Sequence, residues 1–295
     1  LKIIMSRVGI ILAGGYGTRL RPVTTAVSKH LIPIHDKPMI FYPLSILMLI
    51  RIKKIFIVVT ENDHYQYERL LGDGSKYGIS IIYVFQNEPK GIAEGLLRCE
   101  KYVKNSRVCL ILGDNIFYGS DLKKNFTKIS NSKKNTVVGY QVSKPQNYGV
   151  INFRNNKVIS IEEKPKKPKS NFVVTGIYFY ENNVFKYLKK LKPSNRNELE
   201  ITDLNNLLIK DKKLYYKIFG RGYAWLDAGT FDDLLETGKM ISTIESRQNL
   251  KVACLEEIAH NNKWIKIAQI KKNLKELKGT SYGKYIKETI IDKKN

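Results

Sequence analysis

Residues 8–20 have the sequence Val8-Gly9-Ile10-Ile11-Leu12-Ala13-Gly14-Gly15-Tyr16-Gly17-Thr18-Arg19-Leu20. The apolar run at the start of this stretch predicts a buried strand, and the three glycines after it predict a loop. Because glycine has no side chain, such a loop can turn several backbone N–H groups toward one point, which suits a phosphate. Arg19 and Lys29 add cationic donors nearby. The stretch therefore predicts a phosphate- or nucleotide-binding loop, although a plain tight turn would also contain glycines.

Two common nucleotide-binding motifs are absent from this loop. It does not fit G-x-x-x-x-G-K-[ST], and Gly15-Tyr16-Gly17-Thr18-Arg19-Leu20 lacks the last glycine of G-x-G-x-x-G. The residues of the loop alone therefore leave open which class of nucleotide site this is.

Apolar strands alternate with helical segments over the first 112 residues. We expect strands at 8–13, 54–59, 80–85 and 108–112, with helices at 40–50, 64–71 and 91–103 between them. This alternation predicts an α/β fold with a doubly wound, mostly parallel, Rossmann-like sheet. Ligands of such sheets bind beyond the carboxyl ends of the strands, where the glycine loop also lies.

The pattern changes after residue 135. Segments 136–142, 149–153 and 157–162 alternate apolar and polar residues, and Asn155-Asn156 is typical of a hairpin turn. We therefore expect an inserted antiparallel portion at about 136–220 within an α/β core of residues 5–240, with Met5 as the natural start. Helical patterns predict a C-terminal segment, 241–295, that packs on the core or on a neighbouring subunit.

Composition limits the classes of function. The 295 residues include 51 Lys and Arg against 27 Asp and Glu, which gives a formal net charge of +24. Such a charge is typical of nucleic-acid binders, but the lysines are scattered over every segment. We therefore expect small anionic ligands and no nucleic-acid partner.

The cysteines and apolar runs indicate a cytoplasmic protein. Cys99, Cys109 and Cys254 form no C-x-x-C pair, as expected in a reducing compartment. The apolar runs are too short for a membrane span, and no secretory signal is evident, so we expect no membrane partner.

Two aspartates end apolar runs. Asp114 follows the strand at 108–112 within Gly113-Asp114-Asn115, and Asp227 ends Tyr223-Ala224-Trp225-Leu226-Asp227. Carboxylates brought together from distant positions are suitable ligands for one Mg²⁺ ion. For Asp114 alone, a helix N-cap or an Asx turn is an equally good interpretation.

Several of these motifs together resemble the sugar-nucleotide pyrophosphorylases, and more narrowly the glucose-1-phosphate thymidylyltransferases. They are Gly14-Gly15-Tyr16-Gly17-Thr18-Arg19-Leu20 with Pro22 and Ser28-Lys29, and Leu112-Gly113-Asp114-Asn115-Ile116-Phe117-Tyr118-Gly119; the similarity covers nearly the whole chain. The resemblance implies a Mg²⁺-assisted reaction in which glucose 1-phosphate attacks the α-phosphate of dTTP to give dTDP-glucose and pyrophosphate. It also implies the first step towards dTDP-rhamnose and related deoxysugars, and a homo-oligomer, namely a tetramer.

The same resemblance assigns roles to residues, with the inserted portion walling the sugar side. It implies a nucleotide site formed by Gly14, Gly15, Gly17, Thr18, Arg19, Lys29, His30, Gln86, Gly91 and Asp114. It implies a sugar-phosphate site formed by Tyr148, Gly149, Glu163, Lys164, Val174, Arg196 and Trp225. Catalysis is implied to rest on Arg19, Lys29, Asp114, Lys164 and Asp227, with Asp114 and Asp227 holding the metal.

Gln86 is the residue implied to read the base. Its amide offers one donor and one acceptor group, which suits O4 and N3–H of a pyrimidine, and Gly91 leaves room for the ring. The other interpretation of Gln86 is a solvated residue at a strand end. Uracil presents the same polar edge as thymine, so a related pyrophosphorylase that prefers UTP remains the alternative.

The chain departs from the family pattern at two places. His30 stands where the family usually has a glutamine that reaches the nucleotide's sugar, and Glu94-Gly95 stand where glutamine and alanine are usual. A nucleic-acid-binding protein is a distant alternative, and a glycosyltransferase normally has an Asp-x-Asp motif, which this sequence lacks.

Overall fold

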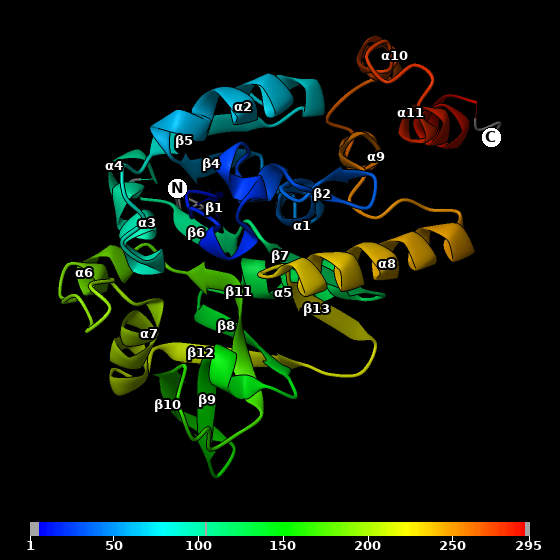
Figure 1. Cartoon of the computed structure of the whole chain (residues 1–295). Helices are drawn as coiled ribbons and strands as arrows, with labels where there is room; N and C mark the ends of the chain where they lie inside the picture. Colours follow the sequence, from blue (N-terminus) through cyan, green and yellow to red (C-terminus); the bar gives the residue numbers. More distant parts are fainter. Residues whose placement is uncertain (1–5, 104, 293–295) are drawn as a thin grey trace.

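The structure is a computed structural model that describes residues 6–103 and 105–292; the expected start at Met5 lies outside this part of the chain. Within it, a nine-stranded mixed sheet is accompanied by two small two-stranded sheets (Figure 1). The strands are β1 Arg7–Leu12, β2 Pro33–Ile34, β3 Lys37–Pro38, β4 Lys54–Val59, β5 Ser80–Phe85, β6 Arg107–Leu112, β7 Asn115–Gly119, β8 Asn135–Gln141, β9 Gly149–Arg154, β10 Lys157–Glu163, β11 Phe172–Tyr180, β12 Leu214–Phe219 and β13 Tyr223–Asp227.

The first four long strands form the parallel half of the sheet. Their order is β6-β1-β4-β5, and β1 runs parallel to both β4 and β6. In this register Ile11 lies opposite Ile57 on one side and Ile111 on the other. The carboxyl ends therefore meet at one edge, which brings together the loop after β1, Gln86 after β5 and Asp114 after β6. The predicted α/β fold with a parallel sheet is confirmed.

The second half of the sheet is mostly antiparallel, as predicted. β11 runs antiparallel to β6 and joins it to β8, β9 and β10. Asn155 and Asn156 have φ angles of 50° and 58° between β9 and β10, as expected for a type I′ hairpin turn. One pair differs from the expected pattern, because β12 runs parallel to β8 at the edge.

Alternate residues of the central strands enter two separate cores on opposite faces of the sheet. Ile11 of β1 and Ile57 of β4 pack on one face with the helices α1 (Phe41–Leu49), α2 (Glu61–Leu71), α5 (Leu122–Asn131) and α9 (Leu255–Asn261). Ile10 of β1 and Val58 of β4 pack on the other face with α3 (Ile92–Arg98), α6 (Val184–Leu188) and α7 (Ile201–Lys210). Each of these four side chains is fully buried, which stabilises the fold by about 1.5–3 kcal/mol per residue. Strands buried on both faces explain why their sequences are continuously apolar.

The helices cover both faces of the sheet, as Figure 1 shows. The predicted helix over 91–103 is divided at Cys99, and the one predicted to begin at 64 begins at Glu61, after the cap Thr60. The helices are α1 Phe41–Leu49, α2 Glu61–Leu71, α3 Ile92–Arg98, α4 Glu100–Val103, α5 Leu122–Asn131, α6 Val184–Leu188, α7 Ile201–Lys210, α8 Phe231–Gln248, α9 Leu255–Asn261, α10 Ile267–Asn273 and α11 Ser281–Ile286, with short 3-10 or π turns between some of them.

The C-terminal helices pack on the core of the same chain. Ile270, Tyr282 and Ile286 join the core that also contains α1, and α8 continues across the division expected at residue 240. Apolar residues between 264 and 277 belong to several short elements, and one of them, Ile267, is 41% exposed. None of the helices in the described part of the chain combines the length and apolarity that crossing a bilayer requires.

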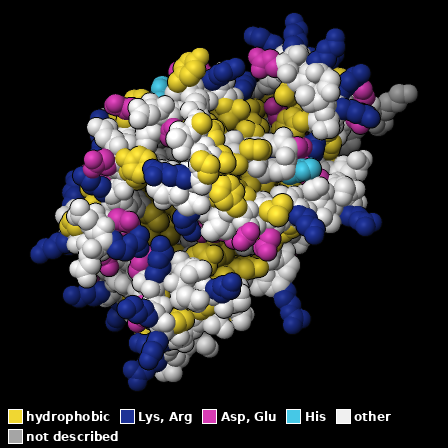
Figure 2. Space-filling model, viewed as in Figure 1, with side chains coloured by type: hydrophobic (Ala, Val, Ile, Leu, Met, Phe, Trp, Pro, Cys, Tyr) yellow, Lys and Arg dark blue, Asp and Glu magenta, His cyan; other side chains and the backbone are white. Residues whose placement is uncertain are grey.

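The cationic side chains form no single stripe on the visible face. Figure 2 shows Lys and Arg side chains spread around the outline of the molecule, with acidic and apolar side chains between them. This distribution agrees with the scatter of the lysines over every segment of the sequence.

Candidate active site

The glycine loop begins where β1 ends, and the backbone holds it against the neighbouring strand. The N–H of Ala13 donates to the carbonyl of Val58 at 2.8 Å. Gly14 is buried, whereas Gly15 and Thr18 are exposed. Gly17 has φ of 58° and starts a 3-10 turn at Thr18, a conformation that favours glycine. The loop therefore keeps exposed backbone at the carboxyl edge of the sheet.

Lys29 and Asp114 form a close ion pair beneath this loop. The Nζ atom of Lys29 lies 2.5 Å from Oδ2 of Asp114, and Lys29 is only 6% exposed. Burial alone would raise the pKa of Asp114, but the positive charge of Lys29 outweighs it and lowers the pKa to about 2. Asp114 is therefore ionised at neutral pH.

Asp227 lies close to this ion pair because strand β13 pairs with strand β7. Residue Asp227 of β13 stands opposite Asn115 of β7, and the N–H of Ala228 donates to the carbonyl of Asp114 at 3.1 Å. Burial, followed by the charge of Asp114, raises the pKa of Asp227 to about 7. The Asp227 side chain accepts no hydrogen bond from residues 6–103 or 105–292. The structure thus brings two carboxylates together, and Lys29 pairs directly with one of them.

Asn115 connects these carboxylates to the sugar side, and the sequence analysis did not single it out. Its Nδ2 donates to Asp114 Oδ1 at 2.9 Å, and its Oδ1 accepts from Trp225 Nε1 at 2.6 Å. The same oxygen accepts from the N–H of Gly176 at 2.9 Å, where any larger residue would collide with Asn115. The position of Asn115 directly after Asp114 is the only sequence signal for this role.

His30 lies beneath the loop and is only 4% exposed. Burial lowers its pKa to about 4, so the ring is neutral at pH 7. Its Nδ1 is 3.3 Å from the Tyr67 hydroxyl, and a Cβ on Gly113 would lie 2.5 Å from its Cδ2. The structure therefore places His30 as a packed residue against Gly113, next to Lys29.

Arg19 lies on the open side of the loop. It is exposed, and within the described ranges no hydrogen-bond or ion-pair partner of its guanidinium is recorded. A Cβ on Gly229 would lie 3.0 Å from its Nη1, so the guanidinium covers the backbone two residues after Asp227. Arg19 thus places a positive charge near the two carboxylates. The N–H donors of its guanidinium remain available for a ligand.

Gln86 borders the glycine loop, whereas Gly91 packs against the backbone of Leu199. Gln86 is buried after β5, and a Cβ on Gly14 would lie 3.0 Å from its Oε1. The hydroxyl of Tyr16 donates to the carbonyl of Asn87 at 3.4 Å, which also joins loop and strand. A side chain on Gly91, whose φ is 104°, would collide with the backbone of Leu199. This close approach explains structurally why position 91 is a glycine, in addition to the room that a base would need.

Residues of the predicted sugar wall lie on several neighbouring elements. The rings of Tyr148 and Trp225 have centroids 5.2 Å apart, and burial followed by the charge of Asp227 raises the pKa of Tyr148 to about 12. The N–H of Lys164 donates to the carbonyl of Tyr148 at 3.0 Å, while the Lys164 side chain is exposed. Val174 is a buried residue of β11 opposite Gly139.

Glu163 is held in place next to Gly149. Its Oε2 accepts from the Thr202 hydroxyl at 2.6 Å and lies 3.4 Å from where a Cβ on Gly149 would stand. Thr202 belongs to α7, so this bond ties the hairpin β9–β10 to that helix.

Arg196 is already surrounded by carboxylates. Its Nη2 donates to both oxygens of Glu198 at 3.0 and 2.9 Å, and its Nη1 lies 3.8 Å from Glu163 and 3.7 Å from Glu200. A phosphate that binds Arg196 would have to compete with these groups. The charge pairing of Arg196 is not evident from the spacing of the sequence.

A second group of carboxylates, away from the glycine loop, is neutralised by lysines. His35, Asp36 and Glu245 lie close enough to share a metal ion. However, Lys37 and Lys251 each pair with both Asp36 and Glu245. Two lysines thus neutralise two carboxylates, so this group ties β2–β3 to α8 and needs no metal.

The cysteines are placed as core residues. All three are buried and none is in a disulfide. Burial raises the pKa of the Cys99 and Cys109 thiols to about 12, so neither is a thiolate nucleophile at neutral pH.

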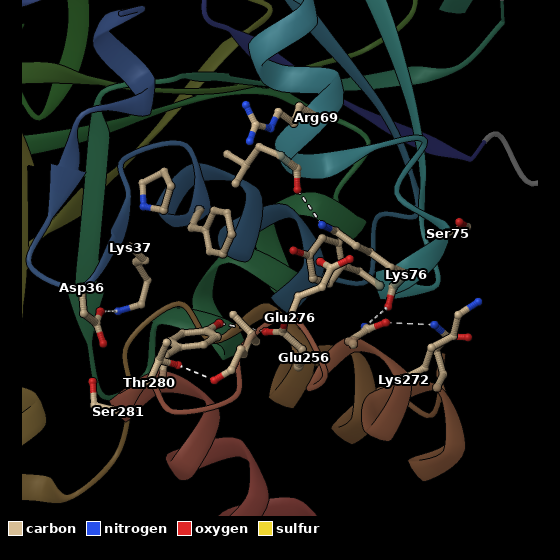
Figure 3. A pocket seen from close by; sticks show the side chains of 18 residues that line it. Asp36, Lys37, Arg69, Ser75, Lys76, Glu256, Lys272, Glu276, Thr280 and Ser281 are labelled. Atoms are coloured by element: carbon tan, nitrogen blue, oxygen red, sulfur yellow. Dashed lines mark hydrogen bonds and ion pairs between the residues drawn. The ribbon is translucent and has the colours of Figure 1, made fainter.

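A pocket of about 680 Å³ lies away from the predicted residues, between α2 and the C-terminal helices. Figure 3 shows Arg69 of α2 on one side of the pocket, and Glu256 of α9 and Lys272 of α10 on the opposite side. Its lining contains none of the predicted site residues.

Sequence comparisons agree with the geometry. The profile of the nucleotidyl transferase family matches residues 8–243. Over 280 residues the chain is 47% identical to a glucose-1-phosphate thymidylyltransferase of Neisseria meningitidis, covering 94% of this chain and 97% of the relative. A glucose-1-phosphate thymidylyltransferase of Mycolicibacterium smegmatis is 44% identical over 279 residues, covering 94% and 97%.

Solved structures give the same picture. A Bacillus anthracis structure, assigned to a glucose-1-phosphate thymidylyltransferase and determined with sucrose, superimposes with a TM-score of 0.74 at 42% identity and covers 80% of this chain and 95% of that chain. A UDP-glucose pyrophosphorylase complexed with UDP-glucose has a TM-score of 0.72 at 24% identity, covering 81% and 99%. The second match shows a shared fold alone.

Proposed function

The chain belongs to the nucleotidyl transferase family and, within it, to the glucose-1-phosphate thymidylyltransferases, and we propose that it makes dTDP-glucose and pyrophosphate from dTTP and glucose 1-phosphate. The observation that carries this proposal is the meeting of the glycine loop, the Lys29–Asp114 pair and Asp227 at one edge of the sheet. A preference for UTP is not favoured, because relatives at 47% and 44% identity are thymidylyltransferases.

The reaction is a displacement at phosphorus. A phosphate oxygen of glucose 1-phosphate forms a bond to the α-phosphorus of dTTP, and the bond from that phosphorus to the oxygen bridging to the β-phosphate breaks with its electron pair. A phosphate monoester dianion is already nucleophilic, so no general base is needed. The enzyme has to hold two polyanions together and neutralise the charge that develops on the α-phosphate.

The residues described above fit these tasks. The exposed backbone of the glycine loop and the free donors of Arg19 are placed to bind the triphosphate. Lys29 adds a buried positive charge next to Asp114. On the other side, the exposed ammonium of Lys164 is available to the sugar phosphate, and Glu163 is held toward Gly149 where sugar hydroxyls would bind.

The carboxylate pair fits a hard divalent cation. Asp114 is ionised, and burial followed by the negative charge of Asp114 raises the pKa of Asp227. Two carboxylates held this close together are suitable for sharing one cation. We propose that Asp114 and Asp227 would hold Mg²⁺, which when bound would neutralise negative charge on the transferring phosphate.

Location and assembly are parts of the same proposal. Buried, unpaired cysteines fit a reducing cytoplasm. Phe231 and Leu235 of α8 are 47% and 74% exposed, which supports a homo-oligomer, with a tetramer as the expected form.

Pyrophosphate release tests the proposal. The rate is measured with glucose 1-phosphate and each of dTTP, UTP, dCTP and GTP, with Mg²⁺ and then with excess chelator. We expect dTTP to be preferred, UTP to be used measurably, and the chelator to stop the reaction. Absence of pyrophosphate release, or equal rates with dTTP and GTP, would contradict the proposed function.

A further inference from the structure

The two ends of the Gln86 amide face different neighbours. Gln86 is 4% exposed, and its Nε2 donates to Oε2 of Glu94 on α3. Its Oε1 faces Gly14, at 3.0 Å from where a Cβ would stand. This oxygen accepts no hydrogen bond within residues 6–103 and 105–292, and it is not among their fully buried unpaired atoms. Gln86 therefore keeps one open acceptor toward the glycine loop.

Glu94 accounts for this orientation. Its side chain is 14% exposed, and its Oε1 accepts from Nε of Arg98 one turn further along the helix. An ionised carboxylate accepts hydrogen bonds and cannot donate one. If the Gln86 amide turned over, its Oε1 would face the carboxylate, and two acceptors would be left without a hydrogen between them. With the Gln86 side chain in this place, Glu94 therefore permits only one orientation of the amide.

The orientation of the Gln86 amide depends on the residue type at position 94. A glutamine there has both a donor and an acceptor group, so it could pair with the Gln86 amide in either orientation. Arg98 binds the other oxygen of Glu94 and does not contact Gln86 in the recorded hydrogen bonds of the described chain. The orientation thus depends on the carboxylate of Glu94 and not on its ion pair.

We infer that Glu94 is a positioning residue that fixes Oε1 of Gln86 toward the nucleotide base, where it accepts the N3–H of thymine. The inference rests on the proposed function, since it assigns base recognition to the same site. Thymine and uracil carry a hydrogen on N3, whereas N3 of cytosine is an acceptor. A fixed acceptor therefore selects thymine over cytosine, and a reversible amide does not.

The test is a comparison of binding constants. Dissociation constants of dTTP and dCTP are measured by calorimetry with Mg²⁺ for the whole protein and for Glu94→Gln. We expect the ratio of the dCTP to the dTTP constant to fall at least about tenfold in Glu94→Gln, which corresponds to about 1.4 kcal/mol of discrimination. Equal weakening of both nucleotides, with an unchanged ratio, is what a merely structural role would give and would overturn the inference.

Two control variants keep the carboxylate chemistry at position 94. Arg98→Ala removes the ion pair but leaves an acceptor-only residue beside Gln86, so its ratio should match that of the unmodified protein. Glu100→Gln removes a carboxylate that pairs with Lys189 outside the base site and should also leave the ratio unchanged. A ratio that falls equally in Arg98→Ala and Glu94→Gln would overturn the role of the carboxylate.

Gln86→Ala separates this inference from the proposed function. We expect Gln86→Ala to bind dTTP more weakly and to lose its discrimination against dCTP. If it discriminates like the unmodified protein, Gln86 does not read the base and the inference falls, although the proposed reaction stands. A second measurement needs no variant: dTTP methylated at N3 should bind the unmodified protein at least about tenfold more weakly than dTTP, and equal binding would overturn the inference.

Discussion

The Nδ2 atom of Asn115 lies 2.9 Å from Oδ1 of Asp114. The carboxamide that makes this bond also accepts from Trp225 and from the backbone of Gly176 through its oxygen. One side chain thus connects a proposed metal ligand, a strand of the sugar wall and an aromatic ring. Because each amide group has its partner, the orientation of Asn115 is fixed, and so is that of Asp114.

Replacing Asn115 by Ala should act mainly on turnover and have a smaller effect on stability. The variant leaves the Trp225 N–H and one Asp114 oxygen without their partner, and loss of such an orienting group typically costs about 10–100-fold in activity. The measurement is kcat for pyrophosphate release at saturating substrates, with the melting temperature recorded in parallel. Asn125→Ala on α5, which removes bonds to Asp121 and Tyr223, is the matched control. Equal rates in the two variants would show that Asn115 does not orient the site.

Replacing Asp114 or Asp227 by Asn should each remove a negative metal ligand. We expect turnover to fall by about a hundredfold or more, because a catalytic metal contributes several kcal/mol to the barrier. Rates are compared over a Mg²⁺ titration, with the exposed Asp121→Asn as control. Mg²⁺-dependent rates near those of the unmodified enzyme in both variants would refute the assignment of the metal ligands.

Glu163→Gln should affect the sugar substrate alone. Glu163 is tied to Thr202 at 2.6 Å on the sugar wall, and a carboxylate accepts hydroxyl hydrogen bonds more strongly than an amide does. We expect KM for glucose 1-phosphate to rise about tenfold or more, with KM for dTTP unchanged. The neighbouring Glu162→Gln, whose recorded partner is Lys169 at 3.4 Å, serves as control. A shift in KM for dTTP of the same size would place Glu163 elsewhere.

The ion cluster around Asp36 predicts a loss of stability in acid. Burial tends to raise the pKa of Asp36, but hydrogen bonds from Lys251 and Lys37 outweigh it and leave the pKa below its ordinary value. Because the folded-state pKa is lower than the unfolded one, this stabilisation is complete above the unfolded pKa of about 4 and is lost as pH falls through the folded pKa.

Asp36→Asn tests this dependence through melting temperatures. At pH 7 the variant should be less stable by about 1–3 kcal/mol, since the two lysines lose a charged partner. Between pH 5 and pH 2 the difference from the unmodified protein should shrink, because both then lack the charge. A difference that stays constant over this range would contradict the account.

The sequence predicted the parallel half of the fold because burial on both faces leaves a clear signal. The strands at β1, β4, β5 and β6 are short apolar runs between helical patterns, and Asn155-Asn156 has the turn chemistry of a type I′ hairpin. The loop after β1 was recognisable from its glycines and its cations. These signals are local, so they can be recognised without knowledge of the tertiary structure.

Other features depend on partners that are distant in the sequence. Glu94 and Gln86 are eight residues apart, yet nothing in their spacing shows that one amide points its Nε2 toward the carboxylate. Asn115 meets Trp225 only because β7 pairs with β13. The carboxylates around Arg196 follow from the folding of a loop onto β10 and α7. Such pairings are determined by tertiary packing, so local sequence patterns do not predict them.

Phosphorus NMR of the complete reaction shows whether glucose 1-phosphate attacks the α-phosphorus of dTTP. The protein is incubated with dTTP, glucose 1-phosphate and Mg²⁺, and the spectrum is followed over time. The account predicts that the signals of both substrates decline together, while the two coupled phosphates of dTDP-glucose and the single signal of pyrophosphate grow in equal amounts. Formation of dTMP with glucose 1-phosphate left intact would mean that water, and not the sugar phosphate, attacks the α-phosphorus, and would contradict the claim that this protein is a nucleotidyltransferase acting on glucose 1-phosphate.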